Sequence, residues 1–281
     1  MKNFIVRSLT GILFVVLLVL SMSYFYSYLI FFSLITCLAV NEFCTLVNKQ
    51  EDVCVNRFIC SLSGVYLFFA ITGFCMGIVG GEAFIPYLLS LLYLMISELY
   101  LKRERPLNNW AYTMLSQLYV ALPFGLLSVL YFYPVLFDGV SISGYIRFLL
   151  PLSVFFFLWA SDTGAYCVGS LFGKHRLFER ISPKKSWEGS IGGALLAILL
   201  AILLGYYSDI MSMLEWIGLA FVVVVFGTWG DLVESLMKRQ LGVKDSGNIL
   251  PGHGGILDRF DSFLLATPAA IIYLYTLSIL G

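Results

Sequence analysis

Long apolar runs, each of about the length that crosses a lipid bilayer, recur along the whole chain. A transmembrane helix takes about 20 consecutive apolar residues, and nine such windows follow one another. They cover residues 4–22, 25–47, 58–79, 84–101, 110–133, 147–171, 190–207, 214–233 and 262–280. We therefore predict an all-α polytopic membrane protein. Residues 1–281 are expected to form a single membrane domain, with N-terminal spans in 1–150 and the catalytic spans and loops in 151–281.

Composition supports a bilayer environment and argues against other classes of protein. The chain is 60% hydrophobic and 12% charged, with a mean hydropathy of +0.91, whereas soluble domains carry about 25% charged residues. A soluble fold of this length could not bury so much apolar surface. The formal net charge is zero, so no basic field indicates nucleic acid as a partner. The six cysteines show neither metal-ligand spacing nor a disulfide framework, and we interpret them as small hydrophobic residues.

The positions of lysine and arginine predict the orientation of the chain, because cytoplasmic loops of membrane proteins are enriched in these residues. With the N-terminus in the cytoplasm, every basic residue except Arg147 lies on the cytoplasmic side of the nine predicted spans. Adding or removing one span would mix the two sides. We therefore expect a cytoplasmic N-terminus and an external C-terminus. The two long loops that carry most of the reactive residue types, 173–193 and Ser235–Asp261, would then face the cytoplasm.

The last of these loops, Ser235–Asp261, combines cations, carboxylates and glycines. Gly254 and Gly255 precede an apolar helix start, which would leave backbone N–H groups free to bind an anion. Asp258 and Asp261 are three residues apart and share one face of a helix. Two carboxylates beside cations suit a hard divalent ion such as Mg²⁺ that bridges phosphate oxygens. The alternative, a loop that only sets topology, explains the basic residues but not the glycines or the paired aspartates.

Two further carboxylates lie within predicted spans: Asp231 near a cytoplasmic end, and Asp162 well inside an apolar run. A carboxylate at the bilayer centre costs about 2.5–3.5 kcal/mol, so it usually faces a partner or a cavity. For Asp231 the alternative is a hydrated carboxylate at a helix end. For Asp162 it is a structural hydrogen bond with Ser161 or Thr163. Small residues near Asp162 allow close helix approach and favour a polar cleft there.

The other long loop, residues 173–193, offers a second set of phosphate-binding groups. Ser182–Pro183 predicts a turn, and Ser186 is placed to cap the helix that follows. That arrangement would direct free N–H groups, together with Lys184 and Lys185, at a phosphate. The alternative for the two lysines is a topology signal or contact with anionic lipid.

These motifs resemble the signature of phosphatidate cytidylyltransferase, also called CDP-diacylglycerol synthase. The signature is met without a gap by Ser235, Lys238–Arg239, Lys244–Asp245, Gly247, Pro251–Gly255, Asp258–Arg259 and Asp261. Stretches at 161–166, 172–175, 182–189 and 230–235 are also similar to the family's C-terminal half, so that the resemblance covers residues 155–265. The first 150 residues resemble the family only in being a run of spans.

The resemblance implies that CTP and phosphatidate react with Mg²⁺ to give CDP-diacylglycerol and pyrophosphate, in the inner membrane of a bacterial cell. It also implies a homodimer in the lipid bilayer, and it leaves open whether a second cation joins Mg²⁺. Asp231 and Asp258 are the first-choice metal ligands, with Asp261 in reserve. With these aspartates, His253 and Lys244 complete the catalytic set, and His253 would donate to a phosphate oxygen or protonate pyrophosphate. The expected substrate contacts are Lys184, Lys185, Ser186, Lys238, Arg239, Arg259, Gly252, Gly254 and Gly255.

Other functions are compatible with parts of the pattern. A membrane kinase that uses CTP to phosphorylate a polyprenol or phytol would share the basic loop and acidic residues, but it would release CDP instead of pyrophosphate. An ion-coupled transporter would use Asp162 and Asp231 as an intramembrane relay. Nine spans without an evident inverted repeat, and motifs crowded on one side, do not favour a transporter. A CDP-alcohol phosphatidyltransferase is disfavoured because its D-G-x2-A-R…D-x3-D spacing is absent from the sequence.

Overall fold

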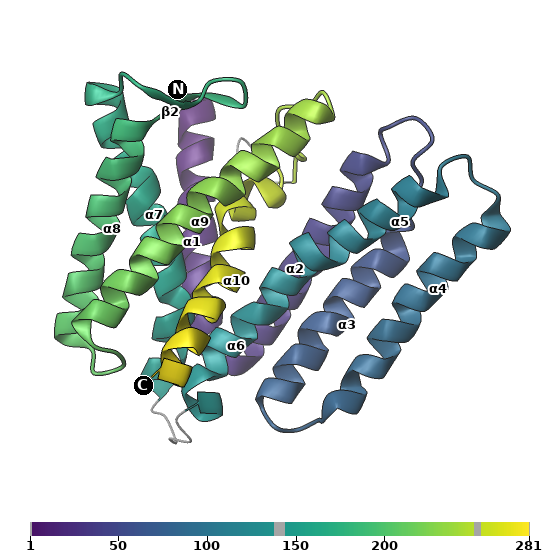
Figure 1. Cartoon of the computed structure of the whole chain (residues 1–281), viewed down its shortest axis with the longest axis horizontal. Helices are drawn as coiled ribbons and strands as arrows, with labels where there is room; N and C mark the ends of the chain where they lie inside the picture. Colours follow the sequence, from purple (N-terminus) through teal and green to yellow (C-terminus); the bar gives the residue numbers. More distant parts are fainter. Residues whose placement is uncertain (1, 138–143, 250–253, 281) are drawn as a thin grey trace. The chain divides into compact units, whose positions relative to one another are not determined.

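A computed structural model describes residues 2–137, 144–249 and 254–280 (Figure 1). Its first half contains α1 (Lys2–Ser23), α2 (Phe25–Val47), α3 (Arg57–Cys75), η1 (Gly81–Phe84), α4 (Ile85–Leu101), α5 (Pro106–Leu115), η2 (Ser116–Ala121) and α6 (Leu122–Phe137). Its second half contains α7 (Gly144–Phe172), β1 (Arg176–Phe178), β2 (Ser182–Ser186), α8 (Trp187–Tyr207), α9 (Met213–Gln240) and α10 (Leu257–Leu280).

The helices confirm the predicted membrane architecture. In the described ranges, eight helical segments are long and apolar enough to cross a membrane. The first predicted span coincides with α1, which contributes a shorter apolar helix, Leu9–Ser23. The fifth span is built from α5, α6 and the π-helical segment η2 between them. A helix therefore lies at the place of every predicted span.

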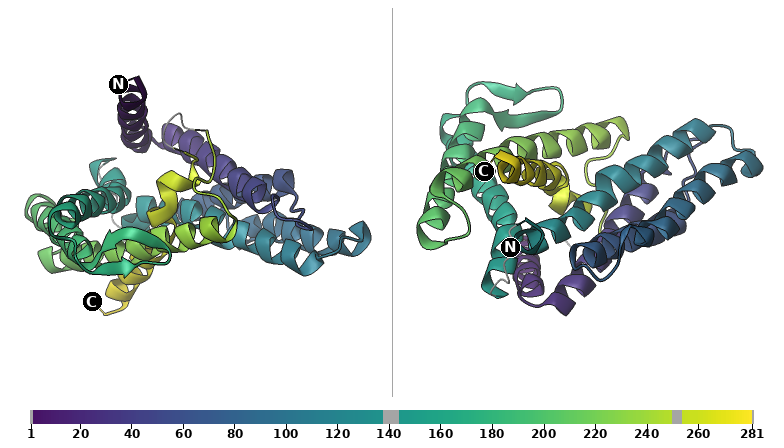
Figure 2. Two further views of the ribbon diagram at one scale, coloured as in Figure 1. Left: turned by 90° about the horizontal axis from the view of Figure 1, so that it is seen from above. Right: turned by 60° about the horizontal axis from the view of Figure 1, so that its bottom comes forward.

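A two-stranded antiparallel hairpin, β1–β2, departs from the all-α expectation in the loop between α7 and α8 (Figure 2). Arg176 pairs with Ser186, and Phe178 pairs with Ser182. The predicted turn at Ser182–Pro183 is therefore wrong, since both residues belong to β2 and the turn falls at residues 179–181. Proline is tolerated here because each strand of a two-stranded hairpin has an open edge that needs no backbone donor.

The chain packs into two compact units that do not follow its order. The first unit comprises Met1–Phe132 and Gln240–Phe260, and the second comprises Tyr133–Arg239 and Asp261–Gly281. The Ser235–Asp261 motif is thus divided, with its central part packed among the N-terminal helices. These N-terminal helices therefore hold part of the motif as well as crossing the membrane.

Polar side chains join the helices of the first unit. The Tyr28 and Ser128 hydroxyls share a hydrogen bond of 2.8 Å, and Thr72 reaches the same serine at 2.7 Å. The Tyr28 ring stacks on Tyr131 with their centroids 4.7 Å apart. Because polar groups in lipid must find partners within the protein, these bonds fix how α2, α3 and α6 pack.

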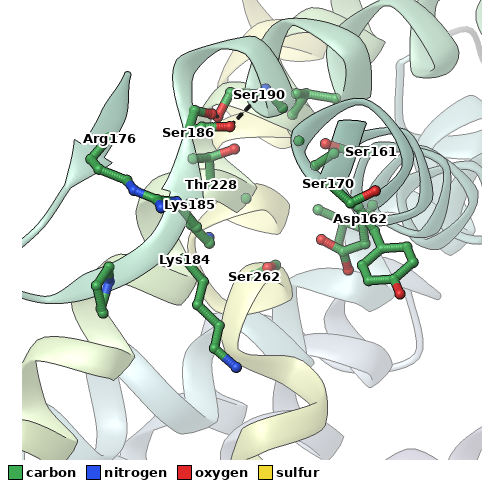
Figure 3. A pocket seen from close by; sticks show the side chains of 18 residues that line it. Ser161, Asp162, Ser170, Arg176, Lys184, Lys185, Ser186, Ser190, Thr228 and Ser262 are labelled. Atoms are coloured by element: carbon green, nitrogen blue, oxygen red, sulfur yellow. Dashed lines mark hydrogen bonds between the residues drawn. The ribbon is translucent and has the colours of Figure 1, made fainter. Parts of the chain in front are cut away.

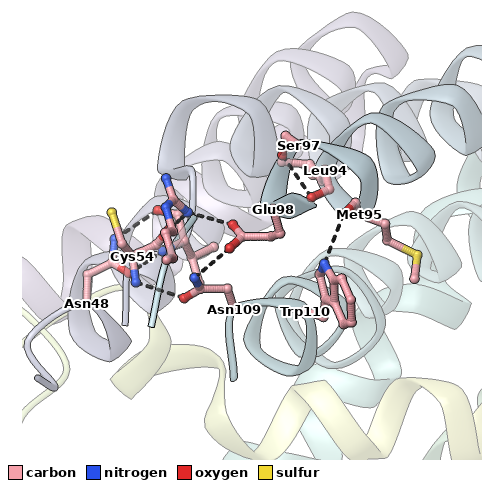
Figure 4. Close-up of polar contacts among 10 residues, drawn as sticks. Asn48, Cys54, Leu94, Met95, Ser97, Glu98, Asn109 and Trp110 are labelled. Carbon is pink, nitrogen blue, oxygen red and sulfur yellow. Dashed lines mark hydrogen bonds and ion pairs between the residues drawn. The ribbon is translucent and has the colours of Figure 1, made fainter. Parts of the chain in front are cut away.

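A second network in this unit surrounds Glu98, whose residue surface is 7% exposed (Figure 4). Its carboxylate accepts hydrogen bonds from Arg103 Nη1 at 2.6 Å and Asn109 Nδ2 at 2.9 Å. Asn109 Oδ1 accepts in turn from the Cys54 N–H at 2.8 Å. The network joins α4 and α5 to the connection between α2 and α3.

In the second unit, α7 and α8 lie side by side (Figures 1 and 2). A β-carbon on Gly164 would lie 2.7 Å from the Gly192 carbonyl oxygen, so glycine is what allows this approach. The expected close helix contact beside Asp162 is therefore confirmed. Phe155 of α7 stacks on Phe263 of α10 with their centroids 5.1 Å apart, which adds the last helix to the same unit.

Candidate active site

A pocket of about 460 Å³ lies in the second unit, among α7, β2, α8, α9 and α10. Figure 3 shows Arg176, Lys184 and Lys185 on one side of it, facing Asp162 on the other. Hydroxyl groups make up much of the remaining polar lining, from Ser161, Ser170, Ser186, Ser190, Thr228 and Ser262. Cations and hydroxyls in one cavity are the groups that bind phosphate oxygens.

Ser186 connects the hairpin to α8 and positions the lysines before it. Its side chain accepts a hydrogen bond from the Gly189 N–H at 3.2 Å, which confirms the predicted N-cap. A β-carbon on Gly173, the residue after α7, would overlap the Gly169 carbonyl oxygen and lie 2.8 Å from Ser186 Oγ, so only glycine fits beside the cap. Lys184 and Lys185 directly precede the positive end of the α8 dipole.

Lys185 forms an ion pair with Asp231 of α9. The other oxygen of this carboxylate, Asp231 Oδ1, accepts a hydrogen bond from Ser235 Oγ at 3.1 Å. Both charged side chains are a little over a quarter exposed, so they are accessible to a ligand. The structure thus brings together Lys185 of the 173–193 loop and Asp231, which the family resemblance had assigned to one site.

Asp261, the first residue of α10 that belongs to the second unit, interacts with other acidic side chains. Electrostatic interactions link Asp261 to three other carboxylates, and together they form what we call the carboxylate cluster: Asp162, Asp231, Glu234 and Asp261. Glu234 is only 2% exposed, and it pairs with Lys238 Nζ at 2.5 Å. Lys185 pairs with Asp231 of this cluster, and Lys238 pairs with Glu234. Such a concentration of like charge favours a bound cation.

The composition of the cluster suits a metal ion that also binds substrate. Among the residues that the structure describes, no three His, Cys, Asp or Glu side chains are arranged to hold a metal by themselves. Mg²⁺ typically takes one or two protein carboxylates and completes its octahedral shell with water and substrate phosphates. The cluster therefore fits Mg²⁺ carried with a phosphate substrate better than an ion enclosed entirely by protein.

In the first unit, Asp258 fastens the central part of the motif. Its Oδ2 accepts hydrogen bonds from the N–H groups of Ser246 at 2.9 Å and Gly255 at 2.8 Å. The expectation of a free N–H at Gly255 is therefore wrong, because a carboxylate of the motif itself occupies it. Gly254 has a φ of +83°, in the left-handed region that favours glycine.

One residue that sequence reasoning missed, Glu42 of α2, binds the same part of the motif. Its carboxylate accepts hydrogen bonds from the N–H groups of Ile256 at 2.9 Å and Leu257 at 3.1 Å, and from the Ser246 hydroxyl. The available signal was an isolated acidic residue within an apolar span, which usually has a partner in the protein.

Five of the predicted site residues remain to be placed. Arg239, Lys244 and Arg259 are exposed, so their charges are accessible. Gly252 and His253 lie outside the described residues.

Comparison with known proteins agrees with the resemblance noted from the motifs. The cytidylyltransferase family model matches residues 3–277 and so includes the N-terminal spans. The phosphatidate cytidylyltransferases of Staphylococcus epidermidis, Staphylococcus haemolyticus and Staphylococcus aureus are 42%, 40% and 40% identical to this chain over 190 residues. Each alignment covers 66% of this chain and 68% of the relative. The chain belongs to the cytidylyltransferase family.

Proposed function

We propose that this protein is a phosphatidate cytidylyltransferase, which transfers CMP from CTP to phosphatidate and gives CDP-diacylglycerol and pyrophosphate. The observation that carries the proposal is the cationic, hydroxyl-lined pocket beside the carboxylate cluster, built from apolar helices long enough to span a membrane. Such a site offers groups for phosphates and for a divalent cation, next to a lipid environment.

The chemistry needs no nucleophile from the protein, because phosphatidate brings its own. An oxygen of its phosphomonoester attacks the α-phosphorus of CTP, and a new P–O bond forms. The bond from that phosphorus to the oxygen bridging to the β-phosphate breaks, and pyrophosphate leaves with the electron pair. The main obstacle is repulsion between two polyanions. Arg176, Lys184 and Lys185 are suited to offset it and to hold the reacting groups in line.

Mg²⁺ is the proposed cofactor, and Asp231 and Asp261 of the carboxylate cluster are its proposed ligands. The repulsion that Asp261 receives from the other three carboxylates of the cluster supports this role, because a bound cation would relieve it. When bound, Mg²⁺ would neutralise charge on the transferred phosphoryl group. Asp258, a first choice from the sequence, is retained as a further candidate ligand. The family resemblance also allows a second cation.

The other site residues are proposed from their place in the signature. Exposed Arg239, Lys244 and Arg259 would neutralise the triphosphate and the lipid phosphate. Lys238, paired with Glu234, would add its charge to the same function. His253 would donate to a phosphate oxygen or protonate pyrophosphate, and Gly252 and Gly254 would let the backbone approach a phosphate. Ser186 would contribute its hydroxyl from the pocket lining.

We also propose that the protein lies in the bacterial inner membrane with its active site facing the cytoplasm. The segregation of lysine and arginine supports this orientation, which gives CTP access from water while the acyl chains remain in lipid. A homodimer is supported by the family resemblance alone.

Labelled CTP and phosphatidate, supplied with Mg²⁺ to the purified protein in detergent, test the function. We expect labelled CDP-diacylglycerol and one pyrophosphate for each CTP consumed. Release of CDP with a phosphorylated lipid alcohol would instead identify a kinase. No product from either reaction, with a protein that remains folded, would overturn the assignment.

A further inference from the structure

Glu42 is a buried carboxylate that joins two distant parts of the chain. It lies on α2 and is 6% exposed. It accepts the N–H groups of Ile256 and Leu257, at 2.9 Å and 3.1 Å, and the hydroxyl of Ser246. More than 200 residues separate Glu42 from these partners. The bonds therefore connect an N-terminal span to both ends of the stretch that contains Pro251–Gly255.

The Glu42 carboxylate occupies the space that a side chain would need at two glycines of the signature. A β-carbon on Gly247 would lie 2.7 Å from Glu42 Oε2, and one on Gly255 would overlap both the Glu42 carboxylate and the Ser246 hydroxyl. Gly255 itself does not have a positive φ, unlike its neighbour Gly254. Its backbone conformation therefore does not require glycine, whereas the space taken by Glu42 does.

The position of Glu42 also matches the electrostatics of α10. Leu257 is the first residue of that helix, so Glu42 binds N–H groups at the positive end of the helix dipole, where a negative charge is stabilising. Asp258 binds Ser246 and Gly255 with its own carboxylate. Two carboxylates, one from α2 and one from the signature, therefore fix the same two ends.

We infer that Glu42 is a positioning residue for CTP: it holds Ser246, Ile256 and Leu257, at two described parts of the signature, in the arrangement that binds the nucleotide. The inference rests on the proposed function, because it takes the signature to be part of the CTP site. A carboxylate required only for folding would act on stability alone. Glu98 provides the comparison, since it is equally buried in the same unit, but its partners Arg103 and Asn109 lie outside the signature.

The test compares Glu42→Gln with Glu98→Gln by steady-state kinetics in detergent, with CTP varied at saturating phosphatidate and the reverse. The amide retains one acceptor and turns a donor toward N–H groups that need an acceptor. We expect the KM for CTP to rise about tenfold in Glu42→Gln, since charge-assisted hydrogen bonds are lost. The KM for phosphatidate should change little. Glu98→Gln should lower the melting temperature comparably and leave both KM values within about twofold of wild type, as for loss of a remote hydrogen bond.

Ser246→Ala keeps the inference testable if Glu42→Gln does not fold. It removes one of the Glu42 partners and leaves the charge in place, so a smaller but selective rise in the KM for CTP is expected. Glu42→Asp should fall between wild type and Glu42→Gln. Equal losses in the Glu42 and Glu98 variants, or a lower melting temperature with an unchanged KM for CTP, would reduce Glu42 to a structural role. Failure of the wild-type protein to make CDP-diacylglycerol would instead overturn the proposed function.

Discussion

The two units of the molecule use their carboxylates in opposite ways. In the first unit, Glu42 and Asp258 accept hydrogen bonds from backbone N–H groups, and Glu98 is matched by one arginine and one amide. In the second unit, the carboxylate cluster brings four acidic side chains together with two paired lysines. In the first arrangement each acid has its own donors, whereas in the second Asp261 is repelled by three neighbouring acids.

The two arrangements suit different tasks: the carboxylates of the first unit fix a conformation, and those of the second are suited to bind a ligand. A carboxylate whose acceptor sites are filled by neighbouring donors holds those donors in place, and removing it leaves them without partners. Carboxylates that repel one another are stabilised when a cation arrives, with or without a substrate. We therefore expect substitutions in the first unit to act through geometry and stability, and those in the cluster to act through metal and phosphate.

The largest expected effect is that of removing charge from the cluster. Asp231→Asn and Asp261→Asn should each lower kcat/KM by about a hundredfold or more, because a metal ligand that stabilises transition-state charge is lost. Part of this loss should be recovered at high Mg²⁺. Initial rates over a Mg²⁺ titration measure it, with Glu98→Gln as the buried-carboxylate control.

Asp258→Asn in the same titration sharpens the comparison. If it loses activity and regains it with Mg²⁺ as the cluster variants do, Asp258 also serves the metal. A loss that Mg²⁺ does not restore would assign it to fixing Ser246 and Gly255. Near-wild-type rates for Asp231→Asn and Asp261→Asn at limiting Mg²⁺ would refute the metal assignment.

A double-mutant cycle tests the shape argument for the first unit. Gly255→Ala places a methyl group against the Glu42 carboxylate, and overpacking of this kind costs about 2 kcal/mol. In a Glu42→Ala background part of that cost should disappear, because the carboxylate is removed while the Ser246 hydroxyl remains. Thermal or denaturant unfolding of both single variants and the double variant gives the coupling energy.

Gly254→Ala is the matched control for this cycle. Its cost arises from a φ of +83°, so it should persist in the Glu42→Ala background. Equal behaviour of the two alanine substitutions would show that Glu42 does not determine the glycine at 255.

The lysines of the 173–193 loop test whether the pocket of the second unit binds phosphate. Lys184→Ala and Lys185→Ala remove charges that line the pocket, and each should raise the KM for CTP or phosphatidate about tenfold, as for loss of a charge-assisted phosphate contact. Lys174→Ala, an exposed lysine of the same loop outside the pocket lining, should leave both values unchanged. A similar effect of all three substitutions would indicate general attraction of anions to a basic loop.

Local patterns in the sequence predicted much of this molecule. Hydropathy located the nine helical segments, because each span must be apolar over its own length. The Ser186 cap was predicted because capping depends on neighbouring residues. Spacing marked Asp258 and Asp261 as a pair, and Asp231 was noted as a carboxylate within a predicted span, although the roles of all three remain proposals.

Long-range contacts could not be predicted in the same way. Glu42 is separated from its partners by more than 200 residues, and no local pattern links it to the signature. The β1–β2 hairpin was missed because the Ser182–Pro183 pair is typical of turns, whereas pairing of Phe178 with Ser182 places it in a strand. The hydrogen bond from the Gly255 N–H to the Asp258 carboxylate likewise could not be predicted, because it depends on the conformation of the Asp258 side chain.

The smallest expected effect comes from the helix caps, one in each unit. Asn56 caps α3 by accepting the Ile59 N–H at 3.1 Å, and Ser186 caps α8 by accepting the Gly189 N–H at 3.2 Å. Asn56→Ala and Ser186→Ala should each lower stability by about 1 kcal/mol, measured by thermal unfolding in one detergent. Only Ser186 lines the pocket, so only Ser186→Ala should also reduce kcat/KM.

Comparing these two variants at equal loss of stability separates a cap that holds a helix from a cap that also contacts substrate. If the two variants reduce activity equally, the activity loss follows stability, and the pocket hydroxyl of Ser186 has no separate role. If Ser186→Ala alone loses activity and Ser186→Thr restores it, the hydroxyl itself is required. That result would show that neutral side chains follow the same division as the carboxylates: Asn56 in the first unit only stabilises the fold, whereas Ser186 in the second unit also serves the substrate.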